Sequence, residues 1–303
     1  MTNYLKLIRW PNLLMIAFFQ YSLRYLLVAP ILDYQEKGLI ITHFDFFLLV
    51  FSTLCIAAGG YVVNDIEDVV IDRINKPSRV IVGDKIKEEI ANNFYTGITF
   101  LGVAIGFYLS FVQDIKLIGF IQIFSAGFLY FYATTYKCIP LLGNLIISAL
   151  TGITALMVIV AEPSAMEDPA VLTFIGSYIV FAFSMTLLRE LIKDLEDQKG
   201  DSMCGCRTLP VIVGNTPTKM LAGFLSLLIV ITLIWIQIST KQWQSMLPFV
   251  YVTGLVTLPM LILSILIFKA SDIKDFAKCA ITTKLIMFTG ISSIAIFYFS
   301  SKQ

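Results

Sequence analysis

Two clusters of acidic residues occur in a chain that otherwise carries little charge. The first covers residues 64–72, with the order Asn-Asp-Ile-Glu-Asp-Val-Val-Ile-Asp, and the second covers residues 189–201. Together they hold nine of the 21 acidic residues of the chain. Mg²⁺ prefers oxygen ligands and is usually bound by one or two carboxylates together with substrate phosphates. The clusters therefore predict a site for a divalent cation and a phosphorylated substrate.

The spacing within each cluster places its oxygen donors on one side of a helix. Positions that differ by four, seven, eight or eleven residues return to nearly the same direction on a helix. In the first cluster these positions are Asn64, Asp68 and Asp72, and in the second they are Glu190, Asp194, Asp197 and Asp201. Gly200 is a candidate end for the second helix just before Asp201. Like charges at this spacing repel one another, so we expect a cation between them.

The basic residues around the clusters could neutralise the remaining phosphate oxygens. They are Arg73, Lys76, Arg79, Lys137, Arg189 and Lys193. A competing interpretation is that they only mark the cytoplasmic side of a membrane protein. Tyr136 and its aromatic neighbours are similarly ambiguous, because they could form an interfacial belt or the wall of a cavity. Acidic helix ends are often plain solvated surface, but two matched clusters favour a site.

The composition is that of a membrane protein. The 303 residues are 57% hydrophobic and only 14% charged, and the net charge is +1. Soluble domains carry about a quarter charged residues. No basic stripe indicates nucleic-acid binding. The five cysteines show no paired framework, and Cys204-Gly205-Cys206 is too closely spaced for a zinc site.

The apolar segments predict an all-α polytopic protein with about nine spans, because a spanning helix needs about 20 apolar residues. We expect the whole chain, residues 1–303, to form one intramembrane domain. The predicted spans are residues 11–32, 44–63, 91–112, 116–136, 141–161, 170–192, 218–239, 246–268 and 281–300.

The loop charges predict the orientation of these spans. Seventeen of the 22 lysines and arginines fall on one side and four on the other. The basic side is cytoplasmic by the positive-inside rule, so we expect the N-terminus inside, the C-terminus outside and both acidic clusters at the cytoplasmic face of the plasma membrane. Arg24 falls within the first span and should face the interior or a cavity.

At the two clusters the chain resembles the UbiA-type intramembrane prenyltransferases. The Asn-Asp-x-x-Asp-x-x-x-Asp motif of that family is similar to residues 64–72 without a gap, and the likeness continues through Arg-Ile-Asn-Lys-Pro-Ser-Arg at residues 73–79. The second family motif resembles residues 194–201 more loosely. The family has a nine-helix fold, so the resemblance covers nearly the whole chain.

The resemblance implies Mg²⁺-dependent transfer of a prenyl group from a prenyl diphosphate to a lipophilic acceptor. With the spacing argument it gives three sets of expected site residues. The expected metal ligands are Asn64, Asp65, Asp68, Asp72, Asp194, Asp197 and Asp201. The expected catalytic residues are Asp68, Asp72, Asp194, Asp197 and Asp201. The expected substrate-binding residues are Asn64, Arg73, Lys76, Arg79, Lys137, Arg189, Lys193 and Tyr136.

Within the family, residues 189–201 and the following Arg207-Thr208-Leu209-Pro210 look most like the branch that attaches geranylgeranyl to geranylgeranylglyceryl phosphate. Prenylation of an aromatic quinone precursor is the alternative acceptor chemistry. A membrane transporter is the alternative from another class, although the acids lie at helix ends and not at mid-membrane. A phosphotransferase acting on CDP-alcohols would need an Asp-Gly…Ala-Arg…Gly pattern that the chain lacks.

Overall fold

The computed structural model describes residues 2–240 and 245–302, and these residues form helices and connecting loops without a β-strand. Within this part of the chain nine helices are long and apolar enough to cross a membrane, which confirms the predicted number. Their bounds are Trp10–Tyr34 (α2, η1 and α3), His43–Glu67 (α4), Glu88–Val112 (α6), Lys116–Thr134 (α7), Leu142–Val160 (α8), Pro169–Met203 (α9), Asn215–Ser239 (α11), Met246–Lys269 (α12, η6 and α13) and Ile273–Ser300 (α14).

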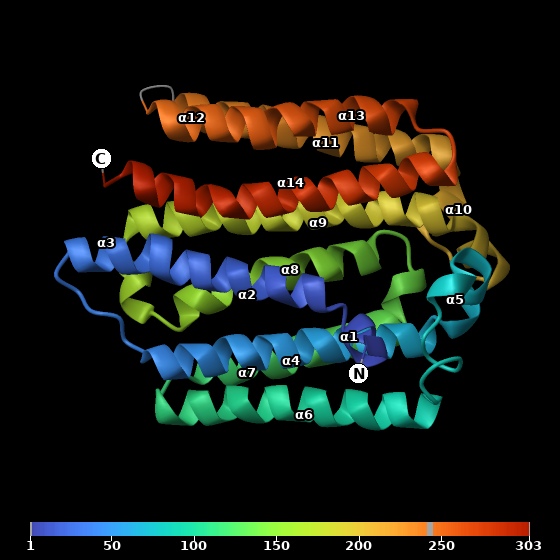
Figure 1. Cartoon of the computed structure of the whole chain (residues 1–303), viewed down its shortest axis with the longest axis horizontal. Helices are drawn as coiled ribbons and strands as arrows, with labels where there is room; N and C mark the ends of the chain where they lie inside the picture. The colour runs from blue at the N-terminus through green and yellow to red at the C-terminus, as the bar shows by residue number, and fades with distance from the viewer. Residues whose placement is uncertain (1, 241–244, 303) are drawn as a thin grey trace.

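Short helices connect these spans near the two ends of the bundle. Figure 1 shows the long helices lying side by side in stacked rows, with α5 and α10 together at one end. The N-terminus lies toward that end and the C-terminus at the other. The short helices are α1 (Thr2–Leu7), α5 (Val69–Asn75), η2 (Pro77–Arg79), η3 (Tyr136–Cys138), η4 (Pro163–Glu167) and α10 (Leu209–Val213).

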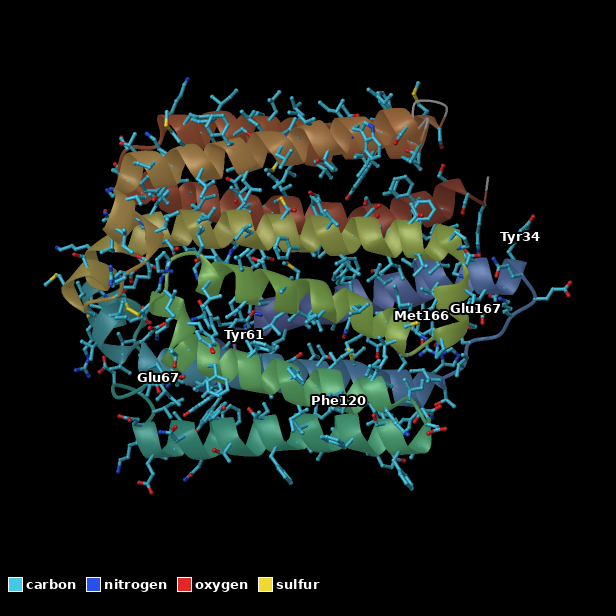
Figure 2. All side chains as sticks on the ribbon, turned by 180° about the vertical axis from the view of Figure 1, so that it is seen from behind. Tyr34, Tyr61, Glu67, Phe120, Met166 and Glu167 are labelled. Atoms are coloured by element: carbon cyan, nitrogen blue, oxygen red, sulfur yellow. A yellow bond between two sulfur atoms is a disulfide. The ribbon has the colours of Figure 1, made fainter. Side chains whose placement is uncertain are left out.

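The outer faces of the bundle are apolar, as a lipid-facing surface must be. Phe111 and Phe100 on α6 are 89% and 73% exposed, and Phe120 on α7 is also exposed. Figure 2 shows Glu67 near one end of the bundle and Tyr34 and Glu167 at the opposite end. Glu67 and Glu167 thus lie at the ends of the bundle, away from its apolar outer faces.

Two spans contain a π-helical segment that ends two residues before a proline. These segments are η1 (Leu23–Val28), which precedes Pro30, and η6 (Thr253–Thr257), which precedes Pro259. Proline has no N–H to donate and its ring crowds the carbonyl four residues earlier, so a local widening of the helix accommodates it. Both spans continue through the widened turn.

Arg24 lies in the first π-helical segment and is completely buried, as predicted. Its guanidinium pairs with the equally buried Glu162 at 2.8 Å and donates to the backbone carbonyl of Ile41. The guanidinium also lies over the ring of Phe46, 4.3 Å from the ring centre. Arg24 thus joins three segments at the end of the bundle remote from α5.

The second acidic cluster lies on a helix that extends beyond the predicted membrane span, as the spacing of its acidic residues predicts. Helix α9 continues past the predicted end of the span at residue 192 to Met203, and Gly200 does not terminate it. The backbone N–H of Gly200 donates to Asn75 Oδ1 at 2.8 Å, and Asn75 Nδ2 donates to the carbonyl of Asp197 at 3.0 Å. A side chain from α5 therefore supports the last turns of α9.

Candidate active site

The first motif spans the junction of two helices. Helix α4 ends at Glu67, Asp68 forms the break, and α5 begins at Val69. The N–H of Asp68 still donates to the carbonyl of Asn64 at 2.9 Å, and the N–H of Asp72 to the carbonyl of Asp68 at 2.8 Å. Because helical hydrogen bonds continue on both sides of the break, the side chains of Asn64, Asp68 and Asp72 remain on one side of the chain.

Asp68 is held by two neighbours. Asn64 Nδ2 donates to one carboxylate oxygen at 2.6 Å, and Lys137 Nζ contacts the other at 2.5 Å. Lys137 belongs to η3, between α7 and α8, so a third segment contributes a charge to the first motif. Asp65, beside Asn64, pairs with the guanidinium of Arg9 at 2.7 Å.

The second motif has a comparable set of partners. Asp194 accepts a hydrogen bond from Asn144 Nδ2 at 2.9 Å, and Asp201 accepts one from the hydroxyl of Thr208 at 3.0 Å. Lys76 Nζ lies 2.6 Å from Asp197 and 3.2 Å from Glu196. Since Lys76 comes directly after α5, it joins the tail of the first motif to the second.

Close packing of the two motifs depends on Gly200. A Cβ atom at this position would lie 2.4 Å from Asn75 Nδ2. Two such atoms cannot come so close, so the Asn75 side chain would have to shift. Helix α5 consequently rests on α9 only because the position that faces Asn75 carries no side chain. Asn75 lies within residues 73–79, which follow the first motif, but its position in the sequence does not predict hydrogen bonds to α9.

Charge crowding is evident in the titration of Asp72. Burial, followed by the nearby carboxylates of Asp68 and Asp65, raises the pKa of Asp72 to about 6. For Lys76, burial lowers the pKa, but Asp197 and Glu196 more than offset this, so its pKa lies above the ordinary value. The first motif thus contains more negative charge than its own neighbours neutralise.

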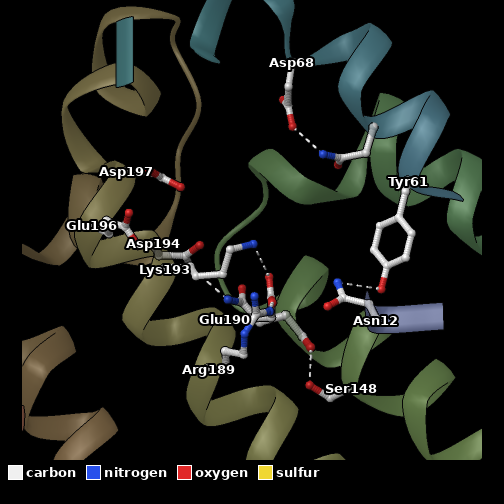
Figure 3. A network of polar contacts seen from close by, with 12 residues as sticks. Asn12, Tyr61, Asp68, Ser148, Arg189, Glu190, Lys193, Asp194, Glu196 and Asp197 are labelled. Atoms are coloured by element: carbon white, nitrogen blue, oxygen red, sulfur yellow. Dashed lines mark hydrogen bonds and ion pairs between the residues drawn. The ribbon is translucent and has the colours of Figure 1, made fainter. Parts of the chain in front are cut away.

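A cavity of about 230 Å³ begins beside the two motifs and extends between the helices. Asn64, Tyr61, Glu190 and Lys193 line its polar end. Figure 3 shows Asp68 and Tyr61 on one side of this region, with Glu190, Lys193 and Asp194 of α9 on the other. The deeper wall is apolar and includes Met15, Phe19, Ile153, Met157 and Ile291. A molecule with an anionic head and an oily tail fits this division.

The donor set fits Mg²⁺ in chemical type. All the motif ligands are carboxylate or amide oxygens, and the buried Oδ1 of Asn64 has no hydrogen-bond partner among the described residues. No group of three or more His, Cys, Asp or Glu side chains in residues 2–240 and 245–302 is arranged to hold a metal by itself.

Not every basic residue expected at the site lies beside the motifs. Arg189 and Lys193 line the cavity, where both pair with Glu190, at 2.8 and 3.5 Å. Arg73 is largely exposed and pairs with Asp84 at 3.1 Å. The remaining two also lie outside the cavity wall: Arg79 is exposed in η2, and the ring of Tyr136 packs on Phe131.

Several polar residues of the cavity were not expected from the sequence. Arg9 adopts a left-handed backbone conformation between α1 and α2, and its guanidinium lies over the ring of Tyr61. Asn12 and Lys284 come from the first and last spans. These residues carry no motif spacing, and single basic residues at helix ends are common in any membrane protein.

The expectation that no cysteines pair was wrong. Cys138 and Cys206 form a disulfide, with their Cα atoms 4.5 Å apart. The bond joins the segment that carries Lys137 to the segment between Asp201 and α10. The two residues are 68 positions apart, so the pairing depends on the tertiary fold and not on local spacing.

Comparisons with known proteins show the family of the chain. The model of the UbiA prenyltransferase family matches residues 34–290. The digeranylgeranylglyceryl phosphate synthase of Sulfolobus acidocaldarius is 31% identical over 251 residues, which cover 80% of this chain and 84% of that protein.

Solved structures extend the likeness to the fold. One, from work on digeranylgeranylglyceryl phosphate synthase in membranes, has a TM-score of 0.58 and 26% identity and covers 100% of this chain and 99% of the other. A UbiA homologue from Archaeoglobus fulgidus, bound to GPP and Mg²⁺, has a TM-score of 0.57 and covers 97% of this chain and 99% of the other. At 16% identity, this second likeness concerns the fold alone.

These matches resolve the choice between enzyme and transporter in favour of the enzyme. The family match covers most of the chain, and the Sulfolobus relative exceeds 30% identity over four fifths of it. The chain therefore belongs to the UbiA prenyltransferase family and is a multi-pass membrane enzyme that transfers prenyl groups.

Proposed function

We propose that this protein transfers a geranylgeranyl group from geranylgeranyl diphosphate to the free hydroxyl of geranylgeranylglyceryl phosphate. The observation that carries the proposal is the cavity, which has two acidic motifs at its mouth, basic side chains at its polar end and an apolar interior. The Sulfolobus relative, a digeranylgeranylglyceryl phosphate synthase, supports this acceptor.

The two motifs are proposed to bind the diphosphate from opposite sides. The residues that would hold Mg²⁺ are Asn64, Asp65, Asp68, Asp72, Asp194, Asp197 and Asp201. When bound, Mg²⁺ would supply positive charge to the diphosphate oxygens as the bond to the prenyl carbon breaks. The A. fulgidus structure with GPP and Mg²⁺ supports both ligands.

The protein's own side chains complete the charge balance. Lys76 and Lys137 already contact carboxylates of the motifs and are placed to donate to the diphosphate oxygens. The apolar wall keeps water away from the allylic carbocation that forms when the C–O bond breaks. The acceptor hydroxyl then attacks the carbocation to form the new C–O bond, and its proton passes to the diphosphate released in the first step.

The proposal includes the whole chain and its place in the cell. Residues 1–303 act as one intramembrane domain in the plasma membrane, with the motif end at the cytoplasmic face. The excess of lysine and arginine on that side, seventeen of 22, supports this orientation.

The test is a product assay with purified protein in detergent, labelled geranylgeranyl diphosphate, Mg²⁺ and separate acceptors. The acceptors are geranylgeranylglyceryl phosphate and an aromatic hydroxy acid. We expect an ether product from the phosphate acceptor alone, identified by its mass. A product from the aromatic acid alone would overturn the proposed acceptor and support a quinone-precursor prenyltransferase.

A further inference from the structure

The polar end of the cavity contains more basic than acidic side chains. The basic residues that line it are Arg9, Arg189, Lys193 and Lys284, and the single acidic one is Glu190. Asp65 neutralises Arg9 from just outside the lining, at 2.7 Å. These cavity residues and Asp65 together carry two more positive than negative charges, at the edge of an apolar chamber where uncompensated charge is costly.

Lys284 shows the excess most clearly. Its ammonium donates to Asn12 Oδ1 at 2.6 Å, and no carboxylate of the described residues lies within ion-pair distance of it. Asn12 in turn donates from Nδ2 to the hydroxyl of Tyr61 at 3.2 Å. The amide is thus fixed from both sides, and it orients the ammonium without neutralising it.

Arg189 and Lys284 lie within the long helices α9 and α14, whereas Arg9 pairs directly with Asp65 of the first motif. Arg189 precedes Asp197 by eight residues on α9, which is about 12 Å along the helix axis. Tyr61 precedes Asp68 by seven residues, or about 10 Å, at the end of α4. The motifs also have lysines of their own, Lys76 and Lys137, so the deeper basic group is available to a second anion.

We propose that Arg9, Arg189 and Lys284 bind the phosphate of the acceptor, an inference that rests on the proposed function. Two guanidinium groups and one ammonium group match the geometry and charge of a phosphate monoester. Glu190 accepts a hydrogen bond from Arg189 and forms an ion pair with Lys193. With its phosphate bound at this depth, the acceptor directs its glycerol hydroxyl toward the motif end, where the prenyl carbon lies.

The test separates the two substrates kinetically. Initial rates are measured against each substrate in turn for the wild type, Lys284→Gln, Lys284→Arg and Arg189→Gln. Losing one charge-assisted hydrogen bond should raise the KM for the phosphorylated acceptor about tenfold or more in both Gln variants, with the KM for the prenyl diphosphate unchanged. Lys284→Arg should recover most of the acceptor affinity. Lys278→Gln, an exposed change on the same helix, is the matched control.

Each result has one meaning. Turnover of the phosphorylated acceptor with an unchanged acceptor KM in both Gln variants overturns the phosphate site and leaves the proposed function intact. A donor KM that rises as much as the acceptor KM assigns these cations to the diphosphate and likewise overturns the inference. Absence of turnover with the phosphorylated acceptor in the wild type overturns the proposed function, and the phosphate site with it.

Discussion

Lys76 and Lys137 are the lysines that contact the acidic motifs directly. Lys137 lies 2.5 Å from Asp68, and Lys76 lies 2.6 Å from Asp197. Each lysine lies in a different segment of the chain from the carboxylate that it contacts. The two contacts therefore depend on the tertiary fold and not on a local helix. Arg73, which the sequence placed in the same group, pairs instead with Asp84 on the surface.

We therefore predict that Lys76→Gln and Lys137→Gln each lower kcat/KM for the prenyl diphosphate about tenfold or more. The physical reason is the loss of a charge-assisted hydrogen bond, worth about 1.5–3 kcal/mol. Steady-state kinetics with purified variants is the measurement. Lys85→Gln, an exposed lysine in the following loop, is the control. Wild-type kinetics in both motif variants would show that these lysines only neutralise the carboxylates.

The sequence predicted the acidic residues better than their partners. Asp68 and Asp194 could be recognised because carboxylates at helical spacing are unusual in an apolar chain. Asn12, Asn144 and Lys284 could not, because each is an isolated polar residue that reaches the site only through the packing of distant helices. Local patterns carry no information on such contacts.

At the scale of elements, the contact of α5 with α9 unites the two motifs. Asn75 makes two hydrogen bonds to α9, and Gly200 provides the space. The predicted membrane span ended at residue 192, whereas the spacing of the acidic residues predicted a helix that continues to Gly200. The structure shows that the polar extension remains helical, supported by a side chain from another element.

We predict that Gly200→Ala impairs the enzyme. The new methyl group displaces Asn75, and the loss of two hydrogen bonds costs about 1–3 kcal/mol and separates α5 from α9. The rate of prenyl transfer should fall several-fold relative to the wild type. This loss should be larger than the fraction of protein that thermal unfolding in detergent shows to be unfolded. Gly176→Ala on the same helix is the matched control, since no atom lies within 4 Å of its added Cβ. Equal activity of the two variants would refute a role for this contact.

The buried pair of Arg24 and Glu162 gives a second prediction for the elements. Arg24→Met leaves Glu162 buried without its partner, which should cost about 3–5 kcal/mol. Lys37→Gln breaks an exposed pair with Glu167 at the same end and should cost less than about 1 kcal/mol. Unfolding of both variants in detergent measures the difference. If Arg24→Met were as stable as Lys37→Gln, Arg24 would not support the bundle.

At the scale of the whole molecule, hydropathy and charge predicted most of the architecture. Nine apolar segments suffice to define nine helices because no other structure satisfies the backbone in hydrocarbon. Their packing, the cavity and the Cys138–Cys206 disulfide depend on contacts between distant residues. The asymmetry of basic residues predicts the orientation of the bundle, and this prediction can be tested directly.

We predict that the N-terminus lies in the cytoplasm and the C-terminus outside. A phosphatase that is active only outside the cytoplasm should be active when fused to the C-terminus and inactive when fused to the N-terminus. A fluorescent protein that folds only in the cytoplasm should behave in the opposite way. Cytoplasmic fluorescence from the C-terminal fusion would contradict the orientation and move the acidic motifs to the outer face.

The central claim is that the two motifs hold one diphosphate together, although Asp65 and Asp194 are 129 positions apart in the sequence. The most direct test is Mg²⁺-dependent binding of an unreactive thio analogue of geranylgeranyl diphosphate, measured by calorimetry. We predict that Asp68→Asn and Asp194→Asn each weaken binding more than about tenfold, whereas Glu88→Gln, an exposed acid at the same end, binds like the wild type. Wild-type affinity in either motif variant would contradict a shared diphosphate site.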